Sequence, residues 1–499
     1  MRKYIQIISF LLAAVTLSGC ENWLDVKPET EVNEDDMFNT EQGFMDALYG
    51  IYVNMGKSDL YGGTLQTALD MTAQYYSYYD ISECPYGHYQ TFEYEHPSCT
   101  AISDALWMRI YCIGLTNNLL KYLDKPEAVQ ICSNYDYLRG EALALRAYLH
   151  FELIRIFAPD VKKNPEYKSI PYRKTFSPDI EPQLKVKEVY QEILADLTEA
   201  KQLLSNDVIR TNGPDWLGES EKKEESDDVT DKNEGYYTSD FLKTRKYRMN
   251  YYAVLGTLAR VHLTLGTTDD MEKAYDYAME VIESGKFRPI QEEHILVSGE
   301  QAKYRDILFT DEFIFGLYSA QVDAFYKSNF DESYGVKKIL INKLSDIYGQ
   351  GTRDLRQTHW FKTSWGTSYL LKHNADLEYA KEKVRMITLA EMYYIAAEAH
   401  PAEAYDLLEE ILPSREIHSS LPVNAGRTEV LTEVLKEYRK EYIGDGQFFY
   451  AYKRLIEEEA AILPLGINIP NENKVLVWPL PQDEIKYGDR ESGIWKTEK

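Results

Sequence analysis

Apolar residues recur at helical spacing over long stretches of this chain, and this pattern limits its fold more than any other feature. The longest stripe consists of Leu138, Ala142, Leu145, Leu149, Leu153 and Phe157. Steps of three and four residues place these side chains on one face of a helix of about five turns. Pro159 follows the stripe and ends the helix, because proline lacks the amide hydrogen that the next turn needs.

Similar stripes predict further helices that are joined in pairs by short turns. They cover about 186–204, 249–266, 270–284, 384–399, 402–412 and 428–443. Short connections favour antiparallel neighbours, and the arrangement resembles a tetratricopeptide-type solenoid, although no clean repeat of that period aligns. Strand-like segments are few and lie at 314–318, 338–341 and 475–478. The sequence therefore predicts a mainly α fold with irregular excursions.

The N-terminus has the composition of an export signal. Arg2 and Lys3 precede a mostly apolar run at 4–15, and Leu17-Ser18-Gly19-Cys20 follows. The run is shorter than the roughly 20 residues that a membrane-spanning helix needs, and this order of features is typical of a signal peptide. The last four residues resemble the bacterial lipobox. We expect a lipoprotein signal peptide at 1–19 and a lipidated Cys20, whose acyl chains hold the protein on a membrane; an ordinary secretory signal is the alternative.

The chain is strongly acidic. Its formal charge of −26 becomes about −28 once the two positive charges of Arg2 and Lys3 leave with the signal peptide. Such a surface repels nucleic acid and anionic lipid headgroups, so we expect neither as a partner.

Four cysteines remain beside Cys20, namely Cys84, Cys99, Cys112 and Cys132. No pair has the spacing of a zinc site, and four thiols in a chain of this length make no disulfide scaffold. We expect them to be packing residues, and the sequence leaves open one bridge between Cys84 and Cys99.

The stretch from Gly218 to Gly235 is dense in charge and contains a single apolar residue, Val229. This composition predicts a solvated loop, and we place an acidic insertion at 216–240. Asp227, Asp228 and Asp231 offer oxygen ligands for Ca²⁺ but lack the alternating spacing and the glycine of a calcium loop. We therefore expect no metal and no cofactor.

Motifs of catalysis are absent from the sequence. Gly56-Lys57-Ser58 lacks the earlier glycine of a phosphate loop, because Ile51 stands at that position. There is no Gly-x-Ser-x-Gly elbow and no His-Glu-x-x-His metal helix. A glycosidase needs two carboxylates about 5–10 Å apart, and the sequence singles out no pair among its 81 acidic residues. We expect no enzyme, with a lipid-anchored glycosidase as the rival hypothesis.

Tyrosine is unusually frequent, with 41 residues. Its flat apolar face and its hydroxyl suit amphipathic ligands such as sugars or peptides, although most of these side chains should fill seams between helices. The densest stretch is 74–96, where we predict ligand contacts at Tyr75, Tyr76, Tyr78, Tyr79, Tyr86 and Tyr89. A second predicted contact is the loop 359–369, with Trp360 and Trp365. Local packing of aromatic residues under a loop is the alternative for both.

Short motifs spread over nearly the whole chain occur in an order that points to one family. The most distinctive are Arg139-Gly140-Glu141 running into Arg146-Ala147-Tyr148, then Leu389-Ala390-Glu391-Met392-Tyr393, then Arg439-Lys440-Glu441 with Phe448-Phe449, and Trp478-Pro479-Leu480-Pro481. The series resembles the SusD/RagB family, although Gln447 and Tyr450 stand where that family often has Arg and Asp. We expect Arg139, Glu141 and Arg146 to be structural and to pair between packed helices.

The resemblance implies both a fold and a function. The fold has tetratricopeptide-like helical pairs packed with an irregular, loop-rich subdomain that faces the ligand. After the signal peptide at 1–19, the chain divides into an N-terminal helical region at 20–215, the acidic insertion at 216–240 and a C-terminal region at 241–499.

The implied function is that of a lipoprotein of the outer membrane that faces the cell exterior. It captures an oligosaccharide or another large nutrient and delivers it to a SusC-like TonB-dependent transporter, without catalysis. A helical scaffold lipoprotein that binds peptides or proteins and has no sugar site is the alternative.

Overall fold

The computed structural model describes residues 34–495, apart from 79–80, 82–83, 111, 218–239, 331–338, 342–343, 352, 457–466 and 468. Several sequence expectations lie outside these described residues. They are the signal peptide at 1–19, Cys20, Tyr79, and the part of the acidic insertion that contains Asp227, Asp228 and Asp231.

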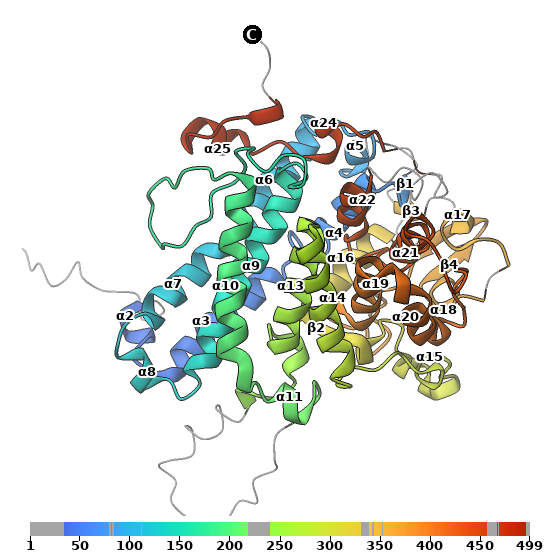
Figure 1. Ribbon diagram of the computed structural model, residues 1–499, viewed down its shortest axis with the longest axis horizontal. Helices are drawn as coiled ribbons and strands as arrows, with labels where there is room; N and C mark the ends of the chain where they lie inside the picture. Colours follow the sequence, from blue (N-terminus) through green and yellow to red (C-terminus); the bar gives the residue numbers. More distant parts are fainter. Residues whose placement is uncertain are drawn as a thin grey trace, which may run out of the picture.

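A row of packed helices forms the body of the molecule (Figure 1). It contains α7 (Ile113–Leu123), α9 (Tyr135–Phe157), α10 (Val186–Leu203), α13 (Tyr251–Leu265), α14 (Thr268–Glu283), α19 (Leu389–Ala399), α20 (Ala404–Ile411) and α21 (Arg427–Glu441). Helix α9 packs between α7 and α10, and the row continues from α10 to α13, α14, α19 and α20. The helices predicted from apolar periodicity are thus confirmed, as is the mainly α fold, except that the first part of the predicted helix 384–399 is a strand and the helix begins only at Leu389.

Helix α9 is the centre of this row. Nearly all of its residues from Leu138 to Phe157 are buried, because neighbours cover it on several sides and not only along the predicted stripe. The helix ends at Phe157, two residues before Pro159, as the proline requires. The end of this helix also bonds to the segment Trp478-Pro479-Leu480-Pro481, which we call the C-terminal strap. The amide of Trp478 donates to the carbonyl of Ile156 at 3.1 Å.

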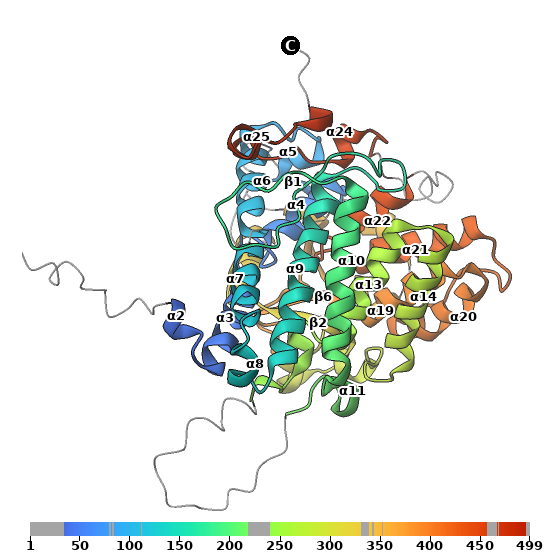
Figure 2. The ribbon, with the colours of Figure 1, turned by 60° about the vertical axis from the view of Figure 1, so that its left-hand side comes forward.

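Shorter helices surround the row. They are α2 (Glu34–Met37), α3 (Glu41–Met55), α4 (Thr64–Thr72), α5 (Gly87–Gln90), α6 (Pro97–Ile110), α8 (Ala128–Ile131), α11 (Ile209–Asn212), α15 (Glu292–Ile295), α16 (Val322–Phe330), α17 (Leu344–Tyr348), α18 (Leu355–His359), α22 (Phe448–Leu455), α24 (Asn473–Leu476) and α25 (Gln482–Tyr487). Short 3₁₀ turns lie at Leu204–Asn206, Arg245–Tyr247, Gly299–Tyr304, Thr310–Glu312, Pro401–Glu403, Leu412–Arg415 and Gly493–Trp495. Figure 2 shows α24 and α25 at the same end of the molecule as α5 and α6.

Three antiparallel pairs of strands occur in the described part of the chain. Strand β1 (Tyr76–Tyr78) pairs with β3 (Ile339–Ile341), β2 (Phe313–Tyr318) with β6 (Lys383–Thr388), and β4 (Phe361–Ser364) with β5 (Thr367–Leu370). Strands β1, β3 and β4 lie with α17 on the right of Figure 1, away from α9 and α10. This is the irregular, loop-rich region that accompanies the helical pairs.

One predicted strand is wrong. The predicted segments 314–318 and 338–341 correspond to β2 and β3, but most of 475–478 belongs to the short helix α24 and to the residues after it. Val475, Leu476 and Trp478 are all buried. A short apolar run that is buried on several sides has no period of its own, so sequence alone does not separate a strand from a helical turn there.

The motif residues of α9 pair with charges on other elements, as expected for structural residues. Arg146 forms a bidentate ion pair with Asp196 of α10 at 2.7 and 2.8 Å. Glu141 is fully buried and accepts hydrogen bonds from Arg245 and Arg248. Arg139 pairs with Asp124 and Glu199. A buried charge without such partners would be strongly destabilising, so these motif residues serve the packing of the helices.

Candidate binding surface

The tyrosine-dense segment 74–96 turns its rings into the core. Tyr75, Tyr76 and Tyr89 are fully buried and Tyr86 is 5% exposed. Tyr75 donates its hydroxyl proton to the carbonyl of Arg439 at 2.5 Å, and Tyr76 donates to Asp70 at 2.9 Å. This corrects the prediction that these four rings form an exposed platform: side chains packed in the core offer no face to a ligand.

Tyr79 lies outside the described residues. Of the other five predicted tyrosines, Tyr78 is the one that lies partly at the surface. It is the last residue of β1 and pairs with Ile339. One side of its ring covers Gly87, where a Cβ atom would lie 3.2 Å from the ring. Burial raises the pKa of its hydroxyl, so Tyr78 offers a ligand the edge of a neutral ring.

The two predicted tryptophans have opposite environments. Trp360 is fully buried, and its indole donates to the carbonyl of Ile307 at 2.6 Å. The ammonium of Lys372 lies 4.1 Å from the centre of its ring. The prediction that Trp360 contacts a ligand is therefore corrected. Trp365 is fully exposed and remains a candidate.

Trp365 stands at the tip of the β4–β5 hairpin. Ser364 pairs with Thr367, so the loop consists of two residues, Trp365 and Gly366. Their φ angles are +52° and +80°, and positive values at both positions define the type I′ turns that prefer Asn-Gly. A tryptophan at the first position is unfavourable for the turn, and its ring gains no contact in return.

An exposed group of tyrosines that the sequence did not single out lies along the β2–β6 pair. We call Tyr304, Tyr318 and Tyr379 the tyrosine strip; they are 42%, 54% and 44% exposed. Tyr318 ends β2 opposite Lys383, and the Lys383 ammonium lies 6.0 Å from the centre of the Tyr379 ring. Tyr304 lies near Tyr379, because the backbone carbonyl of its neighbour Lys303 accepts the amide hydrogen of Glu378, the residue before Tyr379, at 2.8 Å.

Several side chains orient and flank the strip. The ring of Tyr247 packs against that of Tyr318 with 4.3 Å between ring centres, and burial raises the pKa of both hydroxyls. The carboxylate of Asp323 accepts the amide hydrogen of Glu382 at 3.1 Å. Flat rings with a cation and carboxylates around them can hold the apolar face and the hydroxyls of an amphipathic ligand. No local signal separates these tyrosines from buried ones, because Tyr94 and Tyr438 also stand between charged residues and are buried.

The cysteines and acidic groups show no metal chemistry. The four buried cysteines of the described chain, Cys84, Cys99, Cys112 and Cys132, form no disulfide, so the bridge between Cys84 and Cys99 that the sequence left open is not formed. Burial raises the pKa of the Cys99 thiol to about 12. Across the described ranges, no group of three or more His, Cys, Asp or Glu side chains is arranged to hold a metal ion.

The fold defines a class, a helical scaffold, and the tyrosine strip is its candidate binding surface. Residues 22–213 match a SusD-like family model described as "Starch-binding associating with outer membrane". No curated protein matches the chain. Solved structures are similar over nearly its whole length, and their titles name the SusD superfamily or SusD-like proteins.

Three of these structures illustrate the likeness. A SusD superfamily protein from Bacteroides thetaiotaomicron VPI-5482 is 18% identical with a TM-score of 0.67, over 92% of this chain and 99% of that one. A SusD homolog from the same organism is 16% identical with a TM-score of 0.66, over 94% and 99%. A SusD-like carbohydrate binding protein from Bacteroides vulgatus ATCC 8482 is 19% identical with a TM-score of 0.61, over 83% of each chain.

The resemblance to SusD-like proteins rests on two findings that cover different lengths of the chain. The family model covers its N-terminal helical region, and the shared fold extends to nearly the whole of the chain. The family description names a binding activity and an association with the outer membrane. Among the described helices, none combines the length and the apolar character that crossing a bilayer requires.

Proposed function

We propose that this chain is an outer-membrane lipoprotein that faces the cell exterior, is anchored through Cys20, and binds an oligosaccharide on the tyrosine strip. The protein hands its ligand to a SusC-like TonB-dependent transporter and neither makes nor breaks a bond. Two findings support the choice of ligand class. The family model that matches residues 22–213 is described as starch-binding, and one similar structure is that of a carbohydrate binding protein.

The tyrosine strip is the observation that carries the proposal. Sugar rings present C–H faces that stack on aromatic rings and hydroxyls that hydrogen-bond at their edges. Tyr318 and Tyr379 are about half exposed, and Lys383 stands between them. Tyrosine has few rotatable bonds, so a platform of this kind loses little conformational entropy when it binds a ligand.

Affinity electrophoresis tests the proposal. The full chain, purified in detergent, is run through native gels that contain single polysaccharides, with starch among them. We expect at least one glycan to retard the wild-type protein. Tyr318→Ala and Tyr379→Ala should each weaken binding about fivefold, because a lost stacking contact costs on the order of 1 kcal/mol.

Tyr487→Ala is the matched control. Tyr487 is 64% exposed but lies on α25 and outside the strip, so its loss should leave retardation unchanged. Equal weakening by Tyr487→Ala would show that the strip is not the site. If no glycan retards the wild type, the chain is instead a scaffold that binds peptides or proteins.

The transporter is tested separately. Solubilised membranes that contain the tagged protein should yield a large β-barrel partner in comparable amount. If the intact, membrane-derived protein is recovered alone, the delivery step is wrong even where glycan binding is present.

A further inference from the structure

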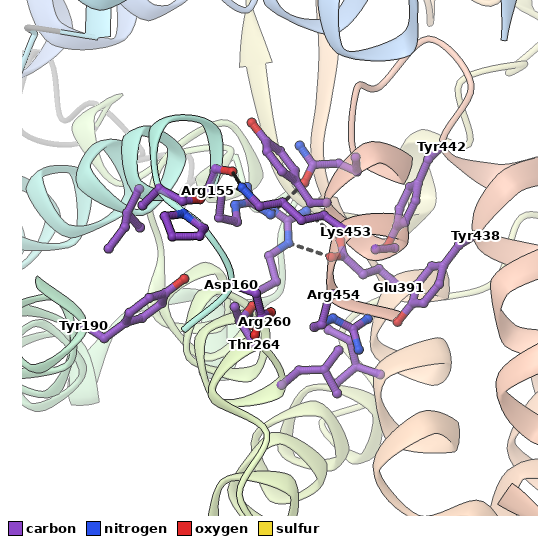
Figure 3. A pocket seen from close by; sticks show the side chains of 18 residues that line it. Arg155, Asp160, Tyr190, Arg260, Thr264, Glu391, Tyr438, Tyr442, Lys453 and Arg454 are labelled. Atoms are coloured by element: carbon purple, nitrogen blue, oxygen red, sulfur yellow. Dashed lines mark hydrogen bonds and ion pairs between the residues drawn. The ribbon is translucent and has the colours of Figure 1, made fainter. Parts of the chain in front are cut away.

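A polar cavity of about 60 Å³ lies where the C-terminal end of α9 meets α13, α19, α21 and α22 (Figure 3). Its lining includes the cations Arg155, Arg260, Lys453 and Arg454 and the acidic residues Asp160 and Glu391. A groove of about 230 Å³ shares Asp160, Lys453 and Arg454 with this cavity and includes the exposed Lys162 and Lys163. The cavity shares no residue with the tyrosine strip.

Each arginine of the cavity has its own carboxylate. Arg260 forms a bidentate pair with Glu391, with 2.5 and 2.6 Å between nitrogen and oxygen atoms. Arg155 pairs with Glu152. Arg454 pairs with Glu398. The three guanidinium charges are therefore neutralised within the protein.

Lys453 is the cation that lacks such a partner. Its ammonium donates to the carbonyls of Arg155 at 2.8 Å and Ala158 at 2.6 Å, and no carboxylate of the described chain bonds to it. Asp160 acts on it only through space, and one oxygen of that carboxylate already accepts the amide hydrogen of Lys162. Lys453 is only 8% exposed, and burial lowers the pKa of its ammonium to about 7, so this side chain can gain or lose its charge near neutral pH.

Three tyrosine hydroxyls face the same space. Tyr190, Tyr438 and Tyr442 line the cavity and are at most 5% exposed, and their hydroxyls have no hydrogen-bond partner in the described part of the protein. Figure 3 shows Tyr190 on one side of Lys453 and Arg454, and Tyr438 and Tyr442 on the other. The Nε–H of Arg155, which also lines the cavity, is likewise buried without an acceptor. Buried donors without acceptors are rare because they are costly.

We propose that this cavity binds a small oxyanion, a carboxylate, phosphate or sulfate group, beside Lys453. Five donors line the cavity beside the carboxylate of Asp160: one ammonium, the Nε–H of Arg155 and three hydroxyls. An anion accepts several such hydrogen bonds at once and favours the charged form of Lys453. The two carbonyl bonds of Lys453 also stabilise the end of α9, but they leave the hydroxyls unexplained.

Isothermal titration calorimetry tests the proposal. The full chain in detergent is titrated with sodium phosphate, sodium sulfate and sodium acetate at constant ionic strength. We expect saturable binding of at least one anion. Tyr190→Phe and Tyr442→Phe should each weaken it about tenfold, because each variant loses one hydrogen bond to a charged group. Lys453→Met should abolish it.

Controls separate the site from general effects. Tyr405→Phe and Lys57→Met change the same residue types outside the cavity and should bind the anion as the wild type does. The tyrosine-to-phenylalanine variants remove one oxygen atom each and keep the packing, so they decide the matter even if Lys453→Met does not fold. Absence of binding by all three anions, or equal binding by the cavity variants, would overturn the proposal. Glycan retardation should persist in Tyr190→Phe, so the two proposals fail independently.

Discussion

At the scale of the residue, most buried charges lie beside groups of the opposite charge. Glu441 is fully buried and receives hydrogen bonds from Arg356 at 2.9 Å, Arg385 at 2.6 Å and Arg415 at 3.3 Å. These cations hold the pKa of its carboxyl well below the ordinary value against the opposing effect of burial. Removing one partner of such a cluster costs roughly 3–5 kcal/mol, so the motif residue Glu441 serves the fold.

Asp70 is a buried acid with no bonded cation in the described part of the protein. It accepts hydrogen bonds from the amide of Gly444 at 2.6 Å and the hydroxyl of Tyr76 at 2.9 Å. Burial nevertheless raises the pKa of its carboxyl to about 8, because no cation bonds to it directly. The folded state therefore favours the protonated acid.

This pKa predicts how stability depends on pH. The unfolded chain ionises Asp70 near pH 4 and the folded chain near pH 8, so the contribution of Asp70 is full below about pH 4 and is lost as pH rises to about 8. Asp70→Asn keeps the acceptor and removes the titration. We expect its stability relative to wild type to rise by about 1.4 kcal/mol per pH unit across this window, measured by urea denaturation.

The exposed Asp376→Asn is the control for this prediction, and its free energy of unfolding should run parallel to that of the wild type at every pH. Parallel curves for Asp70→Asn as well would show that Asp70 is ionised in the folded protein.

At the scale of the element, the β4–β5 hairpin carries a residue that weakens it. The type I′ loop places Trp365 at φ +52° with its ring in solvent. Backbone strain of this kind persists where the surrounding structure enforces it, and it is frequent at functional sites. The hairpin therefore gives Trp365 no structural reason to be tryptophan.

Replacing this residue should separate stability from binding. Trp365→Asn restores the Asn-Gly pair that a type I′ turn prefers, and we expect it to raise the free energy of unfolding by about 0.5–1 kcal/mol. Binding of a glycan or of the transporter should weaken in the same variant, as affinity electrophoresis and co-purification would report. A Trp365→Asn protein that is less stable would show that the ring packs on the fold after all.

The C-terminal strap is a second informative element. Trp478 is fully buried, its amide bonds to the end of α9, and Tyr94 donates to the carbonyl of Val475 at 2.7 Å. The Trp-Pro-Leu-Pro segment thus closes one end of the helical row over α9. Its role is to complete the core and not to contact a ligand.

At the scale of the whole molecule, the proposed attachment to the membrane depends on one residue, Cys20. The described helices offer no membrane-crossing segment, and the charge of −26 disfavours adhesion to anionic lipid. Acyl chains on Cys20 would supply the anchoring that the body lacks.

Cys20→Ala tests this anchor. We expect the variant to leave the membrane fraction, because each buried methylene of an acyl chain contributes about 0.8 kcal/mol and the variant carries none. Cell fractionation and immunoblotting measure the change, and Cys132→Ala, which alters a buried thiol in the body, is the control. Equally firm retention of Cys20→Ala would contradict the anchor.

The sequence by itself determined the helical row, because apolar periodicity is local information. The apolar side chains from Leu138 to Phe157 lie on one face as soon as this segment is helical, whatever the rest of the chain does. The family motifs likewise predicted residues that pair between helices, and Glu141 does so. The expectations about the partners and the membrane anchor also came from the sequence alone, from its net charge and its N-terminal pattern.

Only the tertiary structure decided which aromatic residues meet solvent. Trp360 and Trp365 stand five positions apart in one predicted loop, yet one is fully buried and the other fully exposed. Tyr76 and Tyr318 both belong to strands, but the first is covered by distant segments and the second is not. Exposure depends on what lies across from a side chain, and those neighbours come from parts of the chain that no local pattern connects.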